Sequence, residues 1–587
     1  MLPMKNALPL LLAAATLGGC ATAQQVASDP VEPARTLARP APTAPAPAGG
    51  IVTSADPRAS AAGIEILKAG GSATDAAIAV MLMLTVVEPQ SSGIGGGGFF
   101  VRGDAAGTVT TLDGRETAPA AATEAWFLGD DGEPLGYRAA VLSGLSVGVP
   151  GNIRLAAQAH RDHGQVSWER LFRPAIRQAR EGFSISVRFR EFLERSRARA
   201  GATAEGMALF FDADGEPLAV GTRVRNPALA QTLEAIASGG AEAFYDGPLA
   251  RDIAATTAAA TPRPDGMTVQ DIGAYRVRQR PPVCGEYRGY RVCGMGPPSS
   301  GATTVIGILG ILERFDIGAM GADDPTFWHL FAEAQRLVYA DRARYLADSD
   351  FVPVPVAGLV DRDYLLQRSL LVSPEARLAD VAAGVPPGAD GTGGIGRGPQ
   401  ESGTSHFAVL DGNGNAVSYT STIEGPFGSG LMVGGFFLNN ELTDFSFAPT
   451  SSDGVPVANR VEGSKRPRSS MAPTLVYAPD GSLFMAVGAA GGATIPVQTV
   501  RAIIAAIDFD RDAQGTLELP VLYSPGDRAA MEEGTMLDTM APALKALGHD
   551  MSARRLPLKA NVILCRSGPA SCEGAADPRS EGIAFSF

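Results

Sequence analysis

One stretch of the chain, residues 72–87, predicts a helix with apolar side chains on every face. Ser72 can cap this helix, Asp75 follows three residues later in the capping-box position, and Pro89 ends the helix. A helix that is apolar all round needs cover on all sides, so we expect it to be fully buried. The 587 residues of the chain suffice for one large enzyme fold or two smaller domains.

The composition is that of a globular protein. Hydrophobic residues make up 45% of the chain and charged residues 19%, which excludes a disordered or fibrous protein. The 70 glycines and 43 prolines predict many loops and tight turns. The net charge is -13 and no basic block is present, which argues against nucleic-acid binding.

The N-terminal residues 1–20 have the pattern of a secretory signal peptide. Lys5 precedes an apolar stretch, residues 7–17, that is too short to span a bilayer. The stretch ends in Leu17-Gly18-Gly19-Cys20, which resembles a bacterial lipobox and predicts lipidation of Cys20, with a lipid anchor in the membrane. The alternative is ordinary cleavage at Ala21-Thr22-Ala23, which would release a soluble protein. We therefore expect an exported protein, periplasmic or anchored to the outer membrane, with residues 21–50, rich in Ala and Pro, as an extended linker.

The cysteine spacing agrees with export. Besides Cys20 there are two close pairs, Cys284 with Cys293 and Cys565 with Cys572. An oxidising compartment favours a local disulfide within each pair. A zinc site is the alternative, but neither pair is C-x-x-C and neither has histidines at ligand spacing, so we expect no metal.

Other elements follow from periodicity and from capping and turn residues. Residues 384–403 are rich in Gly and Pro and predict a mobile loop, and Asp411-Gly412-Asn413-Gly414 predicts a turn between two strands. The predicted strands cover residues 405–410 and 415–423, and the predicted helices cover residues 59–68, 227–239, 302–315, 326–347 and 495–507.

Three short motifs match known sites without the structural context that those sites need. Gly93, Gly95 and Gly98 fit G-x-G-x-x-G, but a helix precedes them and a strand follows, the reverse of a dinucleotide site, so we expect a loop packed tightly against other backbone. Ser146 fits G-x-S-x-G, but Gly148, Pro150 and Gly151 oppose the helix that a nucleophile elbow needs. His160 and His163 have H-x-x-H spacing without an acidic partner, which indicates a surface pair.

Thr404 lies where the Gly-rich loop meets the first predicted strand. A threonine hydroxyl is a weak nucleophile, but a free α-amine on the same residue can act as its base. Cleavage of the chain directly before Thr404 would therefore create a catalyst.

At this point the chain resembles the γ-glutamyltransferases, N-terminal-nucleophile hydrolases that cut themselves once into a large and a small subunit. The resemblance runs from about residue 51 to the C-terminus. Its motifs are Glu65-Ile66-Leu67, residues 70–77, Val87-Glu88-Pro89, Ser91-Ser92-Gly93-Ile94-Gly95-Gly96-Gly97-Gly98-Phe99, Asp113-Gly114-Arg115-Glu116, Ala118-Pro119, Pro297-Pro298-Ser299-Ser300-Gly301, Leu438-Asn439-Asn440-Glu441, Asp444-Phe445-Ser446, Lys465-Arg466-Pro467-Arg468-Ser469-Ser470-Met471, Gly491-Gly492 and Asp577-Pro578-Arg579-Ser580.

The resemblance implies an α+β fold, the four-layer αββα sandwich of the N-terminal-nucleophile hydrolases, formed jointly by two autoproteolytic fragments. It implies cleavage between Gly403 and Thr404, which gives a large subunit, residues 51–403, and a small subunit, residues 404–587. Thr404 would be the nucleophile, supported by the hydroxyl of Thr422, and the N–H groups of Gly491 and Gly492 would bind the oxyanion.

The resemblance also implies how a γ-glutamyl substrate binds. Arg115 would bind the α-carboxylate, a group that suits its rigid guanidinium fork, and Ser469 and Ser470 would add hydrogen bonds to it. Asp444, with Glu441 beside it, would pair with the α-ammonium.

The sequence departs from the family pattern at two places. Glu424 stands where the family usually has an asparagine near the α-amino group, so it would add negative charge there. Residues 448–464, which correspond to the family's lid loop, contain no aromatic residue to cover the substrate. A more open pocket would admit bulkier acyl donors, as in the related cephalosporin acylases.

We therefore expect a self-processing γ-glutamyl hydrolase or transferase acting on glutathione-like amides, with water or an amine as acceptor and no metal or organic cofactor. Two alternatives remain at this stage: an amidase of the cephalosporin (glutaryl) acylase type, and an uncleaved, non-catalytic binding protein of the same fold.

Overall fold

The structure, a computed structural model, describes residues 49–396, 403–568 and 571–587. The predicted signal peptide, Cys20 and nearly all of the predicted linker lie outside the described residues. Among the helices of the described ranges, none is long and apolar enough to cross a membrane.

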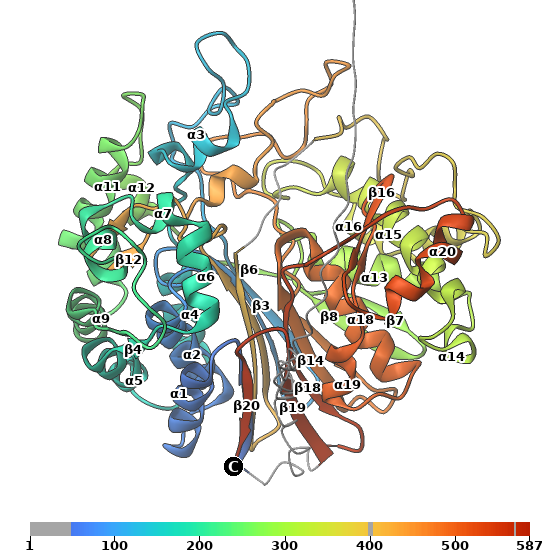
Figure 1. The fold of residues 1–587 in the computed structure, drawn as a ribbon, viewed down its shortest axis with the longest axis horizontal. Helices are drawn as coiled ribbons and strands as arrows, with labels where there is room; N and C mark the ends of the chain where they lie inside the picture. Colours follow the sequence, from blue (N-terminus) through green and yellow to red (C-terminus); the bar gives the residue numbers. More distant parts are fainter. Residues whose placement is uncertain (1–48, 397–402, 569–570) are drawn as a thin grey trace, which may run out of the picture. The chain divides into compact units, whose positions relative to one another are not determined.

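Two antiparallel sheets form the centre of the fold (Figure 1). The first sheet has the order β20 (Ile583–Ser586), β1 (Gly50–Ser54), β9 (Ser405–Asp411), β10 (Ala416–Thr422), β2 (Gly97–Gly103), β3 (Val109–Gly114), β6 (Arg278–Arg280). The second has the order β19 (Cys572–Ala576), β18 (Lys559–Cys565), β14 (Leu483–Ala490), β13 (Thr474–Tyr477), β8 (Tyr290–Gly294), β7 (Val283–Tyr287). The sheets face each other, with β9 and β10 of the first in contact with β14 of the second.

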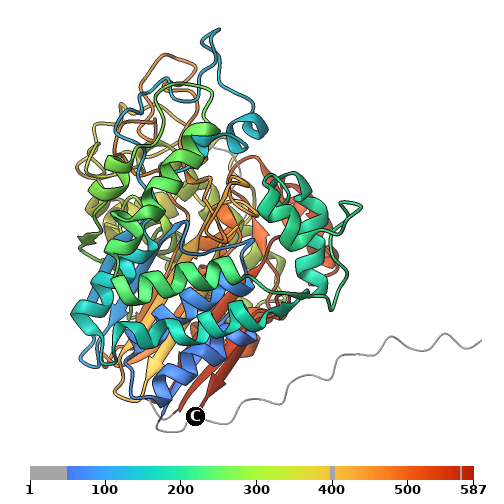
Figure 2. The ribbon, with the colours of Figure 1, turned by 90° about the vertical axis from the view of Figure 1, so that its left-hand side faces the viewer.

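A layer of helices covers the outer face of each sheet. Against the first sheet lie α1 (Pro57–Lys68), α2 (Ala73–Val87) and α4 (Asn152–His163), with α5 (Trp168–Glu181) and α9 (Pro227–Gly239) outside them. Against the second lie α13 (Gly301–Leu312), α18 (Ile495–Ile507) and α19 (Ala513–Glu518), joined by α15 (Pro325–Tyr345) and α17 (Arg362–Ser369). Figure 2 shows the blue-to-green helices of the first layer in front of the strands. The predicted αββα sandwich is confirmed.

Smaller elements complete the described part of the chain. The further helices are α3 (Tyr137–Val141), α6 (Val187–Arg195), α7 (Arg197–Ala200), α8 (Ala204–Phe210), α10 (Glu242–Tyr245), α11 (Pro248–Ala259), α12 (Val269–Ala274), α14 (Ile317–Met320), α16 (Val356–Leu359) and α20 (Met536–Ala546). The further strands are β4 (Phe183–Ser184), β5 (Arg223–Val224), β11 (Met432–Val433), β12 (Phe436–Phe437), β15 (Leu522–Tyr523), β16 (Arg528–Glu532) and β17 (Asp550–Arg554).

Helix α2 is the buried helix that the sequence predicts. Every one of its 15 residues is buried. The Ser72 side chain accepts a hydrogen bond from the Asp75 N–H, and the Asp75 carboxylate accepts one from the Ser72 N–H, which completes the capping box. The carboxylate of Asp411, the last residue of β9, accepts a further hydrogen bond from the N–H of Ala73 at 3.0 Å. The turn of the predicted hairpin thus also holds the start of this helix.

The predicted tight packing of the glycine run is confirmed. A Cβ atom on Gly95 would lie 2.0 Å from the Phe437 carbonyl oxygen, and one on Gly96 would lie 2.0 Å from that of Thr422. These contacts leave no room for any side chain, so the run serves backbone packing. Ser146 is fully buried and donates its hydroxyl to the Val141 and Ser143 carbonyls, an arrangement that does not suit a nucleophile.

The two cysteine pairs form disulfides across neighbouring strands. Cys284 of β7 is bonded to Cys293 of β8, and Cys565 of β18 is bonded to Cys572 of β19. Each bond closes a hairpin of the second sheet. His160 is not the surface residue that its spacing indicates, because its side chain is only 20% exposed and packs against Trp168.

Candidate active site

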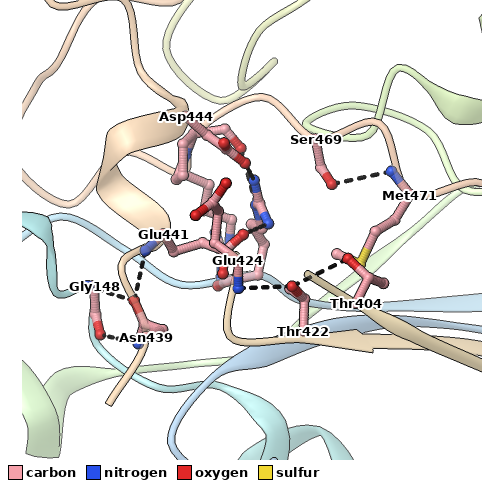
Figure 3. A network of polar contacts seen from close by, with 12 residues as sticks. Gly148, Thr404, Thr422, Glu424, Asn439, Glu441, Asp444, Ser469 and Met471 are labelled. Carbon is pink, nitrogen blue, oxygen red and sulfur yellow. Dashed lines mark hydrogen bonds and ion pairs between the residues drawn. The ribbon is translucent and has the colours of Figure 1, made fainter. Parts of the chain in front are cut away.

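The register of one hairpin brings Thr404 and Thr422 together. Ser405, the first residue of β9, pairs with Ser421 near the end of β10. Thr404 therefore lies opposite Thr422, and their hydroxyl oxygens are 3.3 Å apart (Figure 3). Arg115 lies at the same end of the strands, because it directly follows β3 and Gly114 of β3 pairs with Gly98 of β2. The antiparallel order thus places residues distant in sequence at one end of the sheet.

The Gly403–Thr404 peptide bond lies within hydrogen-bond reach of both hydroxyls. The Thr404 hydroxyl contacts the Gly403 carbonyl oxygen, and the Thr422 hydroxyl donates to the same oxygen at 3.1 Å. The Thr422 oxygen also accepts from the Glu424 N–H at 2.8 Å, which orients it. A Cβ atom on residue 403 would lie 2.3 Å from the Glu424 carbonyl oxygen, so only glycine fits before Thr404.

A buried ion-pair cluster lies next to the two threonines, with Arg115 at its centre. The Arg115 guanidinium pairs with the carboxylates of Glu441 and Asp444 and also donates to the carbonyls of Pro467 and Arg468. Its side chain is 1% exposed. Figure 3 shows Glu424, Glu441 and Asp444 grouped on one side of Thr404 and Thr422. A fixed cation beside carboxylates is a suitable place for a ligand that carries both charges.

The acidic residues of the cluster do not all keep their usual charge. Burial raises the pKa of Glu116, the neighbour of Arg115, to about 7, while the charge of Arg115 opposes the shift. Burial likewise raises the pKa of Glu441 well above its usual range, against Arg115 and with the help of the Glu116 charge. The cluster therefore holds protons at a pH where an exposed glutamate is ionised.

Glu424 occupies a strained position in this cluster. Its φ angle is 72°, in the left-handed region that residues with side chains rarely adopt, and it is 2% exposed. Its carboxylate contacts the side-chain amide of Asn440. Glu424 thus contributes its backbone N–H to the Thr422 hydroxyl and its carboxyl group to the acidic cluster.

The two serines lie on the opposite side, where the large and small predicted subunits meet. The Ser470 hydroxyl accepts from Arg342 of α15 at 2.6 Å, and Arg342 also donates to the Ser300 hydroxyl at 2.8 Å. The Ser469 hydroxyl accepts from the Met471 N–H at 3.2 Å (Figure 3). Arg342 thus links the hydroxyls of Ser300 and Ser470, and Ser300 itself donates to the Ser469 carbonyl at the start of α13.

Gly491 and Gly492 follow the end of β14, in the second sheet. Their φ angles are 130° and 61°, which glycine adopts without strain. Gly491 and Thr404 both line one cavity of about 570 Å³. A backbone N–H at this turn is therefore close to the space in front of the Thr404 hydroxyl. In the described part of the chain, no group of three or more His, Cys, Asp or Glu residues has the arrangement of a metal site.

Comparison with known proteins matches this arrangement to one family. The family model for gamma-glutamyltranspeptidase covers residues 59–587. This chain belongs to the γ-glutamyltranspeptidase family. It is 35% identical to the glutathione hydrolase proenzyme of Escherichia coli over 547 residues, 90% of each chain, and 34% identical to the acylase ACY 1 proenzyme of a Pseudomonas strain, over 85% of this chain and 87% of that one. The structure of a cephalosporin acylase from Bacillus halodurans superposes with a TM-score of 0.80 at 25% identity, over 96% of this chain and 99% of that one.

Several residues of this γ-glutamyltranspeptidase site were not predicted, although some lie within the motifs of the resemblance. Asn439 donates to the carbonyls of Gly95 and Gly148 and accepts from the Glu441 N–H, so it fixes the turn that carries Glu441. Asn439 stands directly before Asn440 and Glu441 in one motif of the resemblance. Glu116, which was not predicted either, directly follows Arg115 in another motif.

A buried ion pair next to the residue that follows Thr404 was not predicted either: Glu88 lies within the motif Val87-Glu88-Pro89, but Lys559 lies in no motif of the resemblance. The Lys559 ammonium lies 2.8 Å from the Glu88 carboxylate and 3.3 Å from the hydroxyl of Ser405, the residue after Thr404. Burial lowers the pKa of Lys559, and the charge of Glu88 opposes that shift. Only the packing of the two sheets brings these residues together.

The segment at residues 448–464 is tied to the site by a polar residue. Asn459 donates to the Asp444 carbonyl at 2.7 Å and accepts from the Arg468 N–H at 2.9 Å. Burial raises the pKa of the Tyr137 hydroxyl in α3, and the charges of Glu424 and Asp444 add to that shift. Tyr137 belongs to the large predicted subunit.

Proposed function

We propose that this chain is a self-processing γ-glutamyl hydrolase or transferase that cleaves γ-glutamyl amides such as glutathione through an acyl-enzyme on Thr404. The observation that carries the proposal is the pair of threonine hydroxyls on the Gly403 carbonyl, directly beside the buried Arg115 cluster. A nucleophile next to a fixed cation and carboxylates suits a substrate with an amide at one end and a zwitterion at the other.

Self-cleavage would begin at the Gly403–Thr404 bond. The Thr404 oxygen attacks the Gly403 carbonyl carbon, the C–N bond breaks as nitrogen takes a proton, and an ester to Thr404 results. Water then hydrolyses the ester, which leaves a carboxylate on Gly403 and a free α-amine on Thr404. The Thr422 hydroxyl, which donates to the Gly403 oxygen, would stabilise the negative charge that develops there.

The turnover reaction would use the new amine as base. It takes the proton of the Thr404 hydroxyl as the oxygen attacks the γ-amide, and the N–H groups of Gly491 and Gly492 bind the oxyanion, a contribution of about 3 kcal/mol for each such donor. The leaving amine departs with the proton. Water or an acceptor amine then resolves the acyl-enzyme.

Arg115 would bind the α-carboxylate by giving up part of its ion pairing with Glu441 and Asp444. Ser469 and Ser470 would lie beside the bound carboxylate. Asp444, Glu441 and Glu424 would face the α-ammonium. Because burial raises the pKa of Glu441, a bound ammonium beside it would favour the ionised carboxylate. The cluster can thus match its charge to the ligand.

A second candidate, an acylase for glutaryl-type amides, is favoured by the acylase relatives. A glutaryl group lacks the α-ammonium, so it would bring no cation to face Asp444 and Glu424, which argues against this candidate. Comparing kcat/KM for γ-glutamyl and glutaryl anilides separates the two, with the γ-glutamyl substrate preferred under our proposal.

Export, the linker and the lipid anchor on Cys20 remain proposals that rest on the N-terminal sequence. The intact mass and N-terminal sequence of the exported protein test them together with the cut site, because lipidation and cleavage each change the mass.

Thr404→Ala tests the core of the proposal. We expect wild-type protein to run as two fragments on a denaturing gel, the smaller beginning with Thr404, and Thr404→Ala to run as one intact band without amidase activity. Thr404→Ser is the matched control, since it keeps a hydroxyl and should still process. Normal processing of Thr404→Ala would refute the assignment of the nucleophile.

A further inference from the structure

Strand β9, which begins directly after Thr404, has a neighbour on only one side at its start among the described strands. Strand β10 pairs with β9 from Ser405 onwards, whereas β1 pairs with it only from Ala408 onwards. Self-cleavage would remove the covalent link between Gly403 and Thr404. Thr404 would then be a chain end, joined to the fold by Ser405 and by its contact with Thr422.

The side chain of Ser405 is held by a buried ion pair. Its hydroxyl donates to the Glu88 carboxylate at 2.6 Å and accepts from the Lys559 ammonium at 3.3 Å. The ammonium also lies 2.8 Å from the same carboxylate and 3.4 Å from the Ser91 hydroxyl, so it has three oxygen atoms around it for its three N–H groups. Hydrogen bonds to charged groups are stronger than those between neutral groups, so this arrangement fixes the Ser405 side chain in place.

Glu88 and Lys559 come from two separate layers of the fold. Glu88 directly follows α2, the buried helix that packs against the first sheet. Lys559 is the first residue of β18, in the second sheet, and its backbone N–H donates to Gln498 of α18 at 3.2 Å. The contact with Ser405 therefore ties the start of β9 to both layers.

The backbone of Lys559 lies beside the turn that we assign to the oxyanion. Lys559 pairs with Ala490, the residue directly before Gly491. Gln498, which accepts from the Lys559 N–H, also donates to the Ala490 carbonyl at 2.8 Å. Lys559 thus contacts the neighbour of Thr404 through its side chain and the neighbour of Gly491 through its backbone.

We propose that Lys559 is a positioning residue, which acts through Ser405 on the nucleophile Thr404. Once the chain has been cut, it sets the distance between the Thr404 hydroxyl and the turn at Gly491. The inference rests on the proposed function, because it concerns acyl transfer to Thr404. Self-cleavage would use the Thr422 hydroxyl for the developing charge, so it does not need this distance. Turnover does need it, and a misplacement of about 1 Å can lower a rate about a hundredfold.

Ser405→Ala removes the hydroxyl that links the ion pair to the strand. We expect this variant to self-cleave at the wild-type rate on a denaturing-gel time course, which also shows that it folds. With γ-glutamyl p-nitroanilide as donor, its kcat and kcat/KM should both fall about tenfold while KM stays unchanged, because the lost contact acts only in the transition state. Ser405→Thr keeps the hydroxyl and should restore most of the rate. Ser552→Ala, at an exposed serine of β17, should behave as wild type.

The double variant Lys559→Met with Glu88→Gln tests the ion pair itself. It removes both charges, so that neither is left buried alone, and it should self-cleave with a kcat that is also about tenfold lower. Adding Ser405→Ala should then cost little more, because the contact is already lost. An undiminished kcat or lost self-cleavage in Ser405→Ala or in the double variant, no recovery in Ser405→Thr, or additive losses in the triple variant would overturn the inference. Absence of self-cleavage and turnover in wild-type protein would instead refute the proposed function.

Discussion

Replacing Glu116 with glutamine should make the fold less sensitive to alkaline pH. Glu116 is fully buried beside Arg115, and its pKa of about 7 in the folded chain compares with 4.5 for an exposed glutamate. A carboxyl whose pKa is raised by folding holds its proton more tightly in the folded than in the unfolded chain. Its ionisation therefore destabilises the fold as the pH rises.

The magnitude follows from the shift. One pKa unit corresponds to about 1.4 kcal/mol, so a rise from 4.5 to about 7 corresponds to about 3 kcal/mol. Below pH 4.5 both states are protonated and the penalty is absent; above pH 7 both are ionised and the penalty is complete. Glu116→Gln keeps the shape of the side chain and removes this contribution, so the variant should gain about 3 kcal/mol relative to the parent between these limits.

The assay is the free energy of unfolding in urea at about pH 4.5 and about pH 8, in a Thr404→Ala background so that a single chain unfolds. Glu441 titrates in the same cluster, so only the difference between variant and parent is compared. Glu124→Gln, at an exposed glutamate, is the matched control and should follow the parent at both pH values. If Glu116→Gln also follows the parent, the reasoning about this carboxyl is refuted.

Two further predictions concern the residues around the nucleophile. Thr422→Val should slow the appearance of the two fragments about a hundredfold, because it removes the hydroxyl that donates to the Gly403 carbonyl. Thr422→Ser keeps a hydroxyl and should process nearly normally. Equal rates of processing for Thr422→Val and wild-type protein on a gel time course would contradict this role. Lys559→Met should destabilise the chain by about 3–5 kcal/mol, because it leaves the Glu88 carboxylate buried without its ammonium partner. Adding Glu88→Gln should recover part of that loss in urea unfolding, and an equal loss in the single and double variants would show that the charge is not the cause.

Local features of the fold could be predicted from the sequence because they depend on near neighbours. The capping box and apolar faces of α2 were predicted within one residue of its observed start, and the turn at Asp411 places β9 beside β10. The observed hairpin register then sets Thr404 opposite Thr422, although the role that we propose for Thr422 came from the resemblance to the family. The two cysteine pairs are near neighbours as well, and each closes the hairpin that contains it.

The roles expected for Arg115, Asp444, Ser469 and Ser470 came from the resemblance to a family, and no spacing in the sequence predicts that Arg115 contacts Asp444, 329 residues away. Their contact depends on the edge of the first sheet meeting the segment before the second sheet. The same is true of Lys559 and Glu88, which are 471 residues apart. Contacts between residues so far apart in sequence are set by how the two sheets pack. Hydrophobic periodicity carries no information about that packing.

Sequence alone determined which segments become buried helices and strands, because side-chain period and turn chemistry act over a few residues. It also determined that a glycine directly precedes Thr404 and that the glycine run at residues 93–98 packs tightly against other backbone. Only the tertiary structure decided the electrical character of the site: which carboxyls surround Arg115, which of them keep a proton, and which ammonium lies beside Ser405. Charge interactions and desolvation depend on distance and burial in three dimensions, and neither quantity is defined until the chain has folded.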